Sequence, residues 1–379
     1  MTVNEYESKR ADLIISFDNF RIDNDERLVG QFNIVSASLH NFIPDLPFSS
    51  HLEIYKNILL HKKLSILEQQ AFSLLDNLKI ESDIPDVYQF LKSRPTVICT
   101  FHIGSYRLIN LLLTKYGVPF SLVIGKDIGE IEGSNFSSLF KSFCGSPSPD
   151  GFNIINAEDS RSGLKMLKEL KRGRALVLYI DGNSGAGADT TENENSCLIQ
   201  FMQQQIHARK GIAALSFIAN VPIVTAVSYR IAWDDVRLRF FEPILPDKTI
   251  DRETFAIEAT QRIYDIVVPI IRANPEQWEG WLYIHHVARI KSICLHEGIS
   301  ETEIDREQLL LFNSDQFGIF KVDNIAFLLR KSGYFFYEID SATYTKLIGC
   351  VEHPARRGDF GDSLFKQLYI NGVLSRTCS

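Results

Sequence analysis

Residues 95–125 read PTVICTFHIGSYRLINLLLTKYGVPFSLVIG and indicate the fold class of the chain more clearly than any other segment. The run 96–101 is short and apolar and follows a proline, which is typical of a strand buried on both faces. Residues 106–116 then have the spacing of a helix, and 119–125 form a second apolar run. A strand, a helix and another buried strand predict a mostly parallel β-sheet covered by helices.

The same alternation continues along the chain. Further strands are predicted at 151–157, 175–181, 222–230 and 236–244, and helices at 159–173, 210–220 and 252–275. Before residue 95 the spacing is helical, and after about residue 305 short strands precede helices. We therefore predict a helical region over 1–95, a mixed, mostly parallel α/β domain over 96–295 and a small α+β module over 305–379.

The composition is that of a globular protein with a well-filled core. Hydrophobic residues make up 45% of the 379 and charged residues 23%. The net charge of −7 argues against a nucleic-acid partner, and the six cysteines form no CxxC pair. The N-terminus lacks the apolar core of a signal peptide, and no apolar run is long enough to span a bilayer. We expect a cytoplasmic protein with no cofactor, no metal site and at most peripheral membrane contact.

His102 follows the first predicted strand, at the edge where open α/β sheets bind ligands. An imidazole there could take a proton from an acceptor hydroxyl or amine near neutral pH. Gly104 permits close approach of another group, and the segment from Ser105 points backbone N–H groups into the same space. The alternative is a histidine that only caps the strand by bonding to loop carbonyls.

Asp181 closes a later strand and opens the glycine-rich loop 182–187. The loop has neither the lysine nor the spacing of a nucleotide-binding loop. Asp181 could face the same cleft as His102, or it could simply form an Asx turn. Farther on, NPEQWEGWLYIHHV (274–287) places Trp278 and Trp281 on one helical face, which predicts a packing surface.

These segments, in this order, resemble the late acyltransferases of lipid A biosynthesis, the lauroyl and myristoyl transferases, and their mannoside-acyltransferase relatives. In that family a strand ends in the histidine of an H-x4-D/E motif, matched by HIGSYR (102–107), and a later strand ends in an aspartate, matched by LYIDGNSGAG (178–187). NPEQWEGW closes the match, which covers about residues 95–290. The resemblance implies transfer of a fatty acyl group from an acyl carrier protein or acyl-CoA thioester to a hydroxyl or amine.

The match breaks at Arg107, which stands where the family has its acidic residue. In the family that carboxylate orients the histidine and stabilises its charged form. We expect a carboxylate from elsewhere to replace it, and the candidates are Asp127, Glu130, Glu132 and Asp181. The alternative is a protein that has kept the fold and lost the activity.

Other residues are expected to contact the substrate. Gly104, Ser105 and Arg107 lie in the motif itself, and a carrier phosphate or pantetheine arm could be received by Lys126, Arg161, Arg209 and Arg230. Backbone N–H groups at 104–106 or 182–185 could stabilise the oxyanion. An acyl groove, unless these side chains are ordinary core, could be lined by helix 106–113 and by Phe136, Leu139, Phe140 and Phe143.

The C-terminal module contains IAFLLRKSGYFFYEI (325–339) followed by helical segments. It resembles the winged-helix leader-peptide recognition elements of ribosomal peptide maturation, which add a peptide as a strand to a sheet edge. That resemblance implies a peptide acceptor and a function in peptide modification during natural product biosynthesis; an oligomerisation subdomain is the alternative. For the whole chain the alternatives are an acyl-thioesterase using the same cleft and an inactive fold that binds a peptide or carrier.

Overall fold

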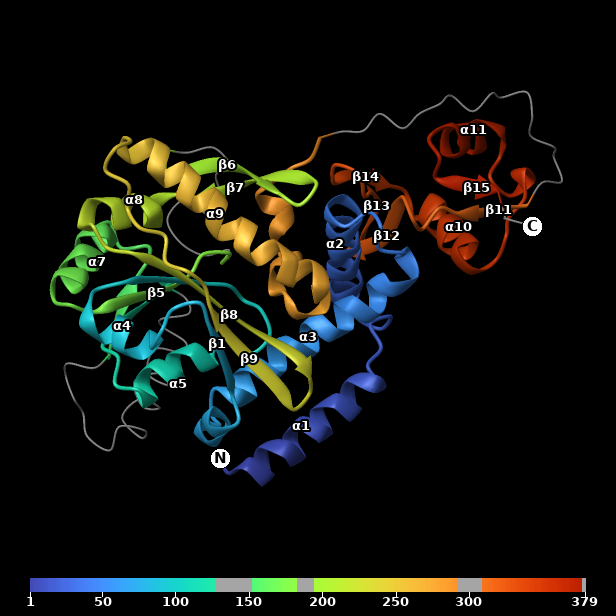
Figure 1. Cartoon of the computed structure of the whole chain (residues 1–379). Helices are drawn as coiled ribbons and strands as arrows, with labels where there is room; N and C mark the ends of the chain where they lie inside the picture. Colours follow the sequence, from blue (N-terminus) through green and yellow to red (C-terminus); the bar gives the residue numbers. More distant parts are fainter. Residues whose placement is uncertain (127–151, 183–193, 292–308, 377–379) are drawn as a thin grey trace. The chain divides into compact units, whose positions relative to one another are not determined.

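The structure is a computed structural model that describes residues 1–126, 152–182, 194–291 and 309–376. The chain divides into two compact units (Figure 1). Unit 1 comprises residues 1–19, 56–201 and 206–287, and unit 2 comprises 20–55, 202–205 and 288–379. These units differ from the predicted boundaries, because the helical region predicted over 1–95 is shared between them.

Unit 1 is built on a sheet whose order, in the described part of the chain, is β1-β9-β8-β2-β5-β3-β4. The strands are β1 (Lys79–Ser82), β2 (Val97–Thr100), β3 (Phe120–Ile124), β4 (Phe152–Asn156), β5 (Ala175–Tyr179), β8 (Ile223–Ala232) and β9 (Asp235–Phe240). Neighbouring strands run parallel except for the β8–β9 pair. The predicted mixed, mostly parallel α/β fold is therefore confirmed.

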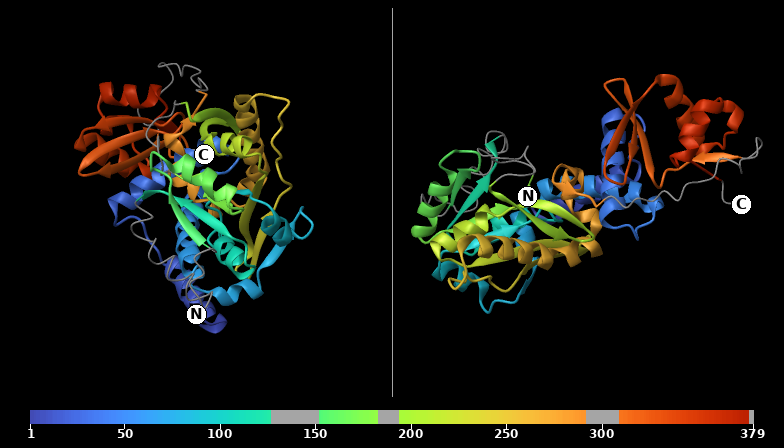
Figure 2. Two further views of the ribbon diagram at one scale, coloured as in Figure 1. Left: turned by 90° about the vertical axis from the view of Figure 1, so that its left-hand side faces the viewer. Right: turned by 90° about the horizontal axis from the view of Figure 1, so that it is seen from above.

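Helices cover both faces of this sheet (Figures 1 and 2). One face is covered by α4 (Val87–Ser93) and α5 (Leu108–Lys115), and the other by α7 (Ser162–Lys171), α8 (Gly211–Ala219) and α9 (Arg252–Ala273). Every residue of β2 and β3 is buried, as expected for strands covered on both sides. β2 lies inside the sheet between β8 and β5, so the turn that follows it opens near the middle of the sheet's carboxyl edge.

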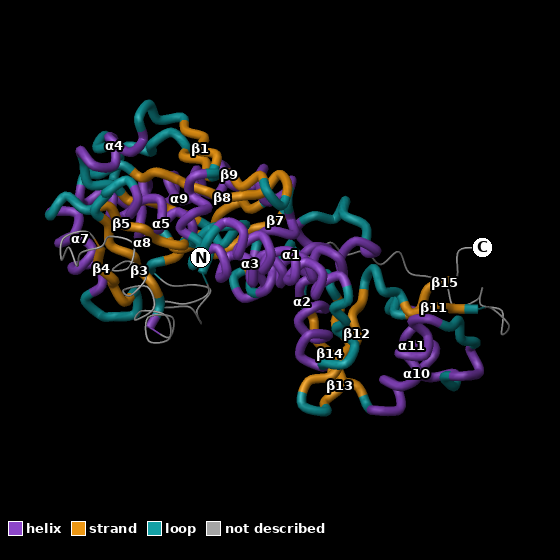
Figure 3. The backbone as a smooth tube through the Cα atoms, turned by 90° about the horizontal axis from the view of Figure 1, so that it is seen from below, coloured by secondary structure: helices purple, strands orange, loops and turns teal. Residues whose placement is uncertain are grey.

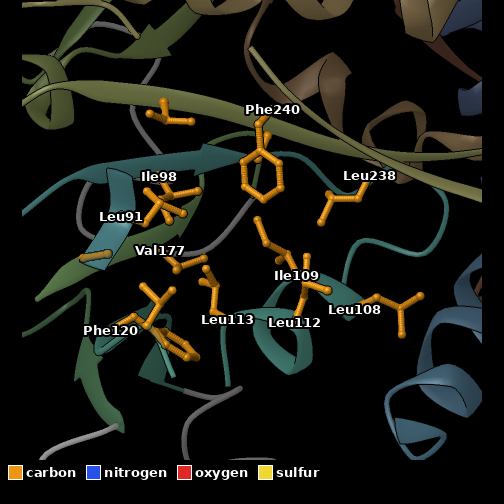
Figure 4. Packing of buried hydrophobic residues seen from close by; sticks show 14 of the residues in the cluster. Leu91, Ile98, Leu108, Ile109, Leu112, Leu113, Phe120, Val177, Leu238 and Phe240 are labelled. Carbon is orange, nitrogen blue, oxygen red and sulfur yellow. The ribbon is translucent and has the colours of Figure 1, made fainter. Parts of the chain in front are cut away.

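Helix α5 belongs to the core and does not line a groove. Its Leu108, Ile109, Leu112 and Leu113 pack with Ile98, Val177, Phe120 and Phe240 in one buried cluster (Figure 4). Burying each such side chain stabilises the fold by about 1.5–3 kcal/mol. The expectation that helix 106–113 lines an acyl groove is wrong, because its apolar side chains pack against the strands of the sheet. The remaining expected groove residues, Phe136, Leu139, Phe140 and Phe143, lie outside the described residues.

The remaining elements of unit 1 start and support this sheet. They include α1 (Val3–Asp18), the short 3-10 segment Phe72–Asp76, the strand β6 (Ser196–Phe201), and the unit's parts of α3 (His51–Glu68) and of β7 (Gln204–Arg209), the strand that pairs with β6. Helix α9 is capped by Asp251, whose carboxylate accepts the N–H groups of Glu253 and Thr254. No helix in the described ranges has the length and apolarity required to cross a bilayer.

Unit 2 contains a three-stranded antiparallel sheet made of β12 (Phe317–Val322), β13 (Ile325–Arg330) and β14 (Phe335–Ile339). The β12–β13 turn has both Asp323 and Asn324 at positive φ, as a two-residue type I′ hairpin requires. A second small sheet pairs β11 (Leu310–Phe312) with β15 (Leu374–Arg376), and the helices α10 (Ser341–Glu352) and α11 (Asp362–Ile370) follow β14.

Helix α2 (Glu26–Phe42) completes unit 2 from the other end of the chain (Figure 3). It packs along β12, where Ala37 joins Phe320 and Leu329 in a buried cluster. Asn41 Nδ2 donates to the Lys331 carbonyl at 2.7 Å, which ties the end of the helix to the β13–β14 turn. The C-terminal segment 305–379 is thus completed by residues from the N-terminal region.

Candidate active site

The turn that follows β2 is held from two sides. On one side the His102 N–H donates to the Asp181 carboxylate at 2.9 Å, and Asp181 follows the neighbouring strand β5. On the other side the Gly104 N–H donates to the Gln277 carbonyl at 2.9 Å, and the Glu279 N–H donates to the His102 carbonyl at 3.0 Å. The helix predicted from residue 106 therefore begins only at Leu108, because residues 102–107 are used for this turn.

His102 and Asp181 also meet through their side chains. Nδ1 of His102 lies 2.8 Å from Asp181 Oδ1, and Asp181 Oδ2 accepts the indole N–H of Trp278 at 2.7 Å. An ionised carboxylate only accepts hydrogen bonds, so Nδ1 carries the proton and the lone pair is on Nε2. None of the described residues hydrogen-bonds Nε2, and the His102 side chain keeps 19% of its surface exposed while Asp181 keeps 2%.

This environment changes the basicity of the imidazole. Burial lowers the pKa of His102, but the charge and hydrogen bond of Asp181 outweigh burial and raise it above its ordinary value. The carboxylate of Glu279 acts in the same direction, whereas the cation of Arg107 opposes it. The result is a partly buried histidine whose protonated form is stabilised by a fixed carboxylate.

Two tyrosines fix the plane of the imidazole. The Tyr106 ring meets it edge-on with centroids 4.9 Å apart, and the Tyr179 ring lies 4.8 Å away. Tyr179 in turn donates its hydroxyl to the Tyr106 carbonyl at 3.2 Å. Neither tyrosine is among the residues predicted for the site, since a tyrosine in a strand or turn looks like any other core aromatic until its neighbours are known.

Gly104 packs the turn against the sheet and does not face a substrate. It has φ of +55°, and a Cβ there would lie 3.0 Å from Gln277 Oε1 and 3.1 Å from the Tyr229 Cα. Only glycine combines that backbone conformation with such close approach. Its N–H is already bonded to Gln277, so it is not the oxyanion donor that the sequence predicts. Of the loop donors predicted at 182–185, the Gly182 N–H faces the Tyr179 carbonyl at 3.4 Å and the rest lie outside the described residues.

Arg230 is a structural cation. Only 3% of it is exposed, and its Nη2 donates to Glu68 and, at 2.6 Å, to Ser105 Oγ. Glu68 also accepts the Tyr6 hydroxyl at 2.8 Å. The prediction that Arg230 receives a carrier phosphate is wrong, because its charge is neutralised inside the protein, and Ser105 is likewise occupied by this buried network.

Arg107 replaces the expected carboxylate without contacting Asp181 in any described hydrogen bond. Its Nη1 donates to Gln69 Oε1 at 2.7 Å, and its guanidinium lies 5.4 Å from the centre of the Tyr106 ring. It therefore ties the turn to the residue that follows α3 and supplies a positive charge near His102. Of the four candidate carboxylates, Asp181 lies against His102, whereas Asp127, Glu130 and Glu132 lie outside the described residues.

A cavity of about 300 Å³ opens beside His102, between α7, α8 and the carboxyl ends of β3 and β5. Its walls are mostly apolar and include Val123, Met166, Leu178, Ile212 and Leu215. His102 and Gly182 form part of its lining, and Arg209 contributes a cation whose pKa is lowered by burial. Lys126 and Arg161, also predicted to contact substrate, are exposed and are not part of this lining.

Trp278 is predicted from the sequence to belong to a packing surface, but in the structure it contacts the site through Asp181. The predicted helix over 274–287 is instead a series of 3-10 turns, Pro275–Gln277, Glu279–Leu282 and Ile284–His286. This irregular path brings the Trp278 indole onto Asp181, while Trp281 packs 4.8 Å away. A buried indole needs an acceptor for its N–H, which is the signal that could have flagged it, but the sequence does not say which acceptor.

Comparison with known proteins adds little to this picture. No protein-family model matches the chain, and no curated protein matches it. Among solved structures the chain is similar to the 1-acyl-sn-glycerophosphate (LPA) acyltransferase PlsC from Thermotoga maritima, with a TM-score of 0.32 and 11% identity over 67% of this chain and 98% of that one. A similarity at this level says nothing about activity, which has to be inferred from the site.

The pKa of His102 tests the site directly. Asp181→Asn removes the charge that raises this pKa, so the imidazole should lose its proton at a lower pH than in the wild type. A histidine NMR titration would measure it, with Glu279→Gln as a graded control that lowers the pKa by less. An unchanged His102 titration in Asp181→Asn would contradict the geometry described above.

Proposed function

We propose that the protein is an acyltransferase, which moves a fatty acyl group from an acyl carrier protein or acyl-CoA thioester to a hydroxyl or amine acceptor. The observation that carries this proposal is the pairing of His102 Nδ1 with Asp181 beside an apolar cavity. That pairing leaves Nε2 as a base next to a space suited to a hydrocarbon chain. Asp181 would also supply the carboxylate that the family has at the position of Arg107.

The proposed reaction is an acyl exchange without any change in oxidation state. Nε2 of His102 takes the proton from the acceptor O–H or N–H as that atom attacks the thioester carbonyl carbon. The new C–O or C–N bond forms a tetrahedral oxyanion, and its collapse breaks the C–S bond. The proton then passes from the imidazolium to the leaving thiolate. Asp181 holds the imidazole in the tautomer required for the first step and stabilises the imidazolium that follows.

The central experiment replaces the base. With labelled acyl-carrier protein or acyl-CoA and a panel of hydroxyl and amine acceptors, His102→Ala should lower the transfer rate by roughly 10²–10⁴-fold, the usual contribution of a general base. His286→Ala, at an exposed histidine, is the matched control and should transfer at the wild-type rate. Equal transfer by His102→Ala would reject the mechanism, and free acid as the sole product would favour the thioesterase alternative.

The cavity is proposed to hold the acyl chain. A cavity of roughly 150 Å³ takes up a benzene ring, so a cavity of about 300 Å³ has room for a chain on the order of ten carbons. Each methylene that leaves water contributes about 0.8 kcal/mol to binding. Chain length would then be set by the walls that α7 and α8 provide.

Gly163 offers a way to shorten this cavity. It lines the cavity on α7, and a Cβ placed there would meet nothing within 4 Å. Gly163→Leu should therefore fold normally, project into the space and raise KM for long-chain donors at least tenfold while leaving acetyl donors unaffected. Gly163→Ala is the control, since it adds one methyl group and should retain long-chain transfer. Equal use of long donors by Gly163→Leu would place the chain elsewhere.

We further propose that unit 2 binds an extended peptide, which would be the acceptor. β14 pairs only with β13 among the described residues, so its other edge has backbone groups free for strand addition. Its Phe335, Phe336 and Tyr337 are 43%, 46% and 45% exposed. Tyr337 stands opposite Leu328, and Leu328 belongs to the cluster formed with α10 and α11, so Phe335 and Tyr337 lie on the face of the sheet that packs against α10 and α11.

Substitutions on β14 test this proposal better than deletion of 305–379, because deletion would also strip α2 of its packing partner. A random peptide library selected on the full chain should yield binders that Phe335→Ser with Tyr337→Ser weakens at least tenfold, as measured by calorimetry. Ile325→Ser is the matched control, since Ile325 is 45% exposed but begins β13. Failure to select any binder, or equal weakening by the control, would contradict the proposal.

A further inference from the structure

Helix α7 carries a stripe of positive charge on its exposed face. Between residues 161 and 174 the chain has six basic side chains and one acidic one, although its net charge is −7. Arg161, Leu164, Lys168 and Lys171 follow one another at i, i+3, i+7 and i+10, so they form one stripe along the helix, and all four are exposed. Leu164, at 68% exposed, places an apolar side chain inside this cationic row.

The charges of this stripe are largely uncompensated. Lys165, beside it, pairs with Asp159 at 2.5 Å, and Arg172 pairs with Glu169 at 2.7 Å. Lys168 and Lys171 have no acidic partner among the described residues. A row of exposed cations around one exposed leucine has the composition of a surface that docks an acidic protein, with charge for steering and an apolar anchor.

The opposite side of the same helix forms the wall of the cavity. Ser162, Gly163 and Met166 line the cavity, and Leu170 is 2% exposed. One short helix therefore presents a cationic surface outward and the cavity wall inward. A donor bound to the outer stripe would stand within one helix diameter, about 10 Å, of the space beside His102.

We propose that the exposed stripe of α7, made of Arg161, Leu164, Lys168 and Lys171, is the docking surface for an acidic acyl carrier protein that delivers the thioester to this cavity. The proposal rests on the acyltransferase function and specifies its donor. It assigns Arg161 to contact with the carrier protein's surface outside the cavity, and it adds Lys168 and Lys171, which the sequence alone does not single out.

The length of the stripe suits a protein partner. From Arg161 to Lys171 the helix rises about 15 Å, which is the length of several turns of a helix on a partner's surface, and the donor comparison below distinguishes a carrier protein from coenzyme A. The apolar content favours a protein over a membrane, since an interfacial helix inserts a continuous apolar face. On α7 Met166 and Leu170 face inward and Leu167 is only partly exposed, so Leu164 is the one fully exposed apolar side chain of this described helix and it lies among the cations.

The test compares donors that share the acyl group and differ in the carrier. Lys168→Glu with Lys171→Glu should lower kcat/KM for an acyl-carrier protein at least tenfold at low salt and abolish its salt dependence. The same variant should use acyl-pantetheine and acyl-CoA within twofold of the wild type, because neither needs the outer surface. Lys9→Glu with Lys92→Glu makes the same charge change at exposed lysines on α1 and α4, and should leave all donors unaffected.

Two results would overturn the proposal. One is an equal loss of kcat/KM with acyl-CoA or in the control variant. The other is binding to anionic phosphatidylserine vesicles that the α7 variant loses while its use of carrier protein is unchanged. If the wild type transfers from no donor, the proposed function fails on its own. In that case calorimetry with the unloaded carrier protein tests the docking surface separately. If the wild type binds the carrier and the α7 variant does not, the docking surface is supported. If the wild type does not bind the carrier, the docking proposal is overturned.

Discussion

The carboxylate of Asp181 is the interaction on which the site depends. It accepts the His102 backbone N–H, the His102 imidazole and the Trp278 indole, and so joins the ends of two neighbouring strands to a segment far along the chain. Hydrogen bonds to a charged acceptor contribute about 1.5–3 kcal/mol each. Of these donors only the imidazole can change its protonation state, and the charge of Asp181 raises its pKa.

A second set of buried charges, the ion pair of Arg230 and Glu68, contacts this turn through Ser105. Arg230 and Glu68 are both almost fully buried, and Ser105 and Tyr6 extend the pair toward the turn and toward α1. A buried ion pair is weak evidence for stability, but losing one partner typically costs about 3–5 kcal/mol because the other charge is left uncompensated. The pair therefore specifies where the turn sits on the sheet, and Gly104 lets the turn come close enough to be held there.

The two faces of the sheet differ in what packs against them: one carries a hydrophobic core and the other the cavity. On the side of α4 and α5 the side chains pack into one buried hydrophobic cluster, part of which Figure 4 shows. On the side of α7 and α8 small residues, among them Ala157, Gly163 and Gly211, line the cavity beside His102. The helix after β2, α5, is strongly apolar, and its side chains are used in the core. The charged helix α7 lies on the other face of the sheet and forms a cavity wall.

Local patterns in the sequence were sufficient to predict the alternating α/β fold, the position of His102 at a strand end and Asp181 as one of its candidate partners, because strand and helix periodicity and the end of an apolar run are properties of neighbouring residues. They were insufficient to show that Arg230 is neutralised by Glu68, that Trp278 caps the carboxylate, or that α2 completes the C-terminal module. Those pairings join residues separated by 97 or more positions, and nothing in the local sequence records them. Burial and partners decide whether a charge is structural or available to a substrate, and both exist only once the chain has folded.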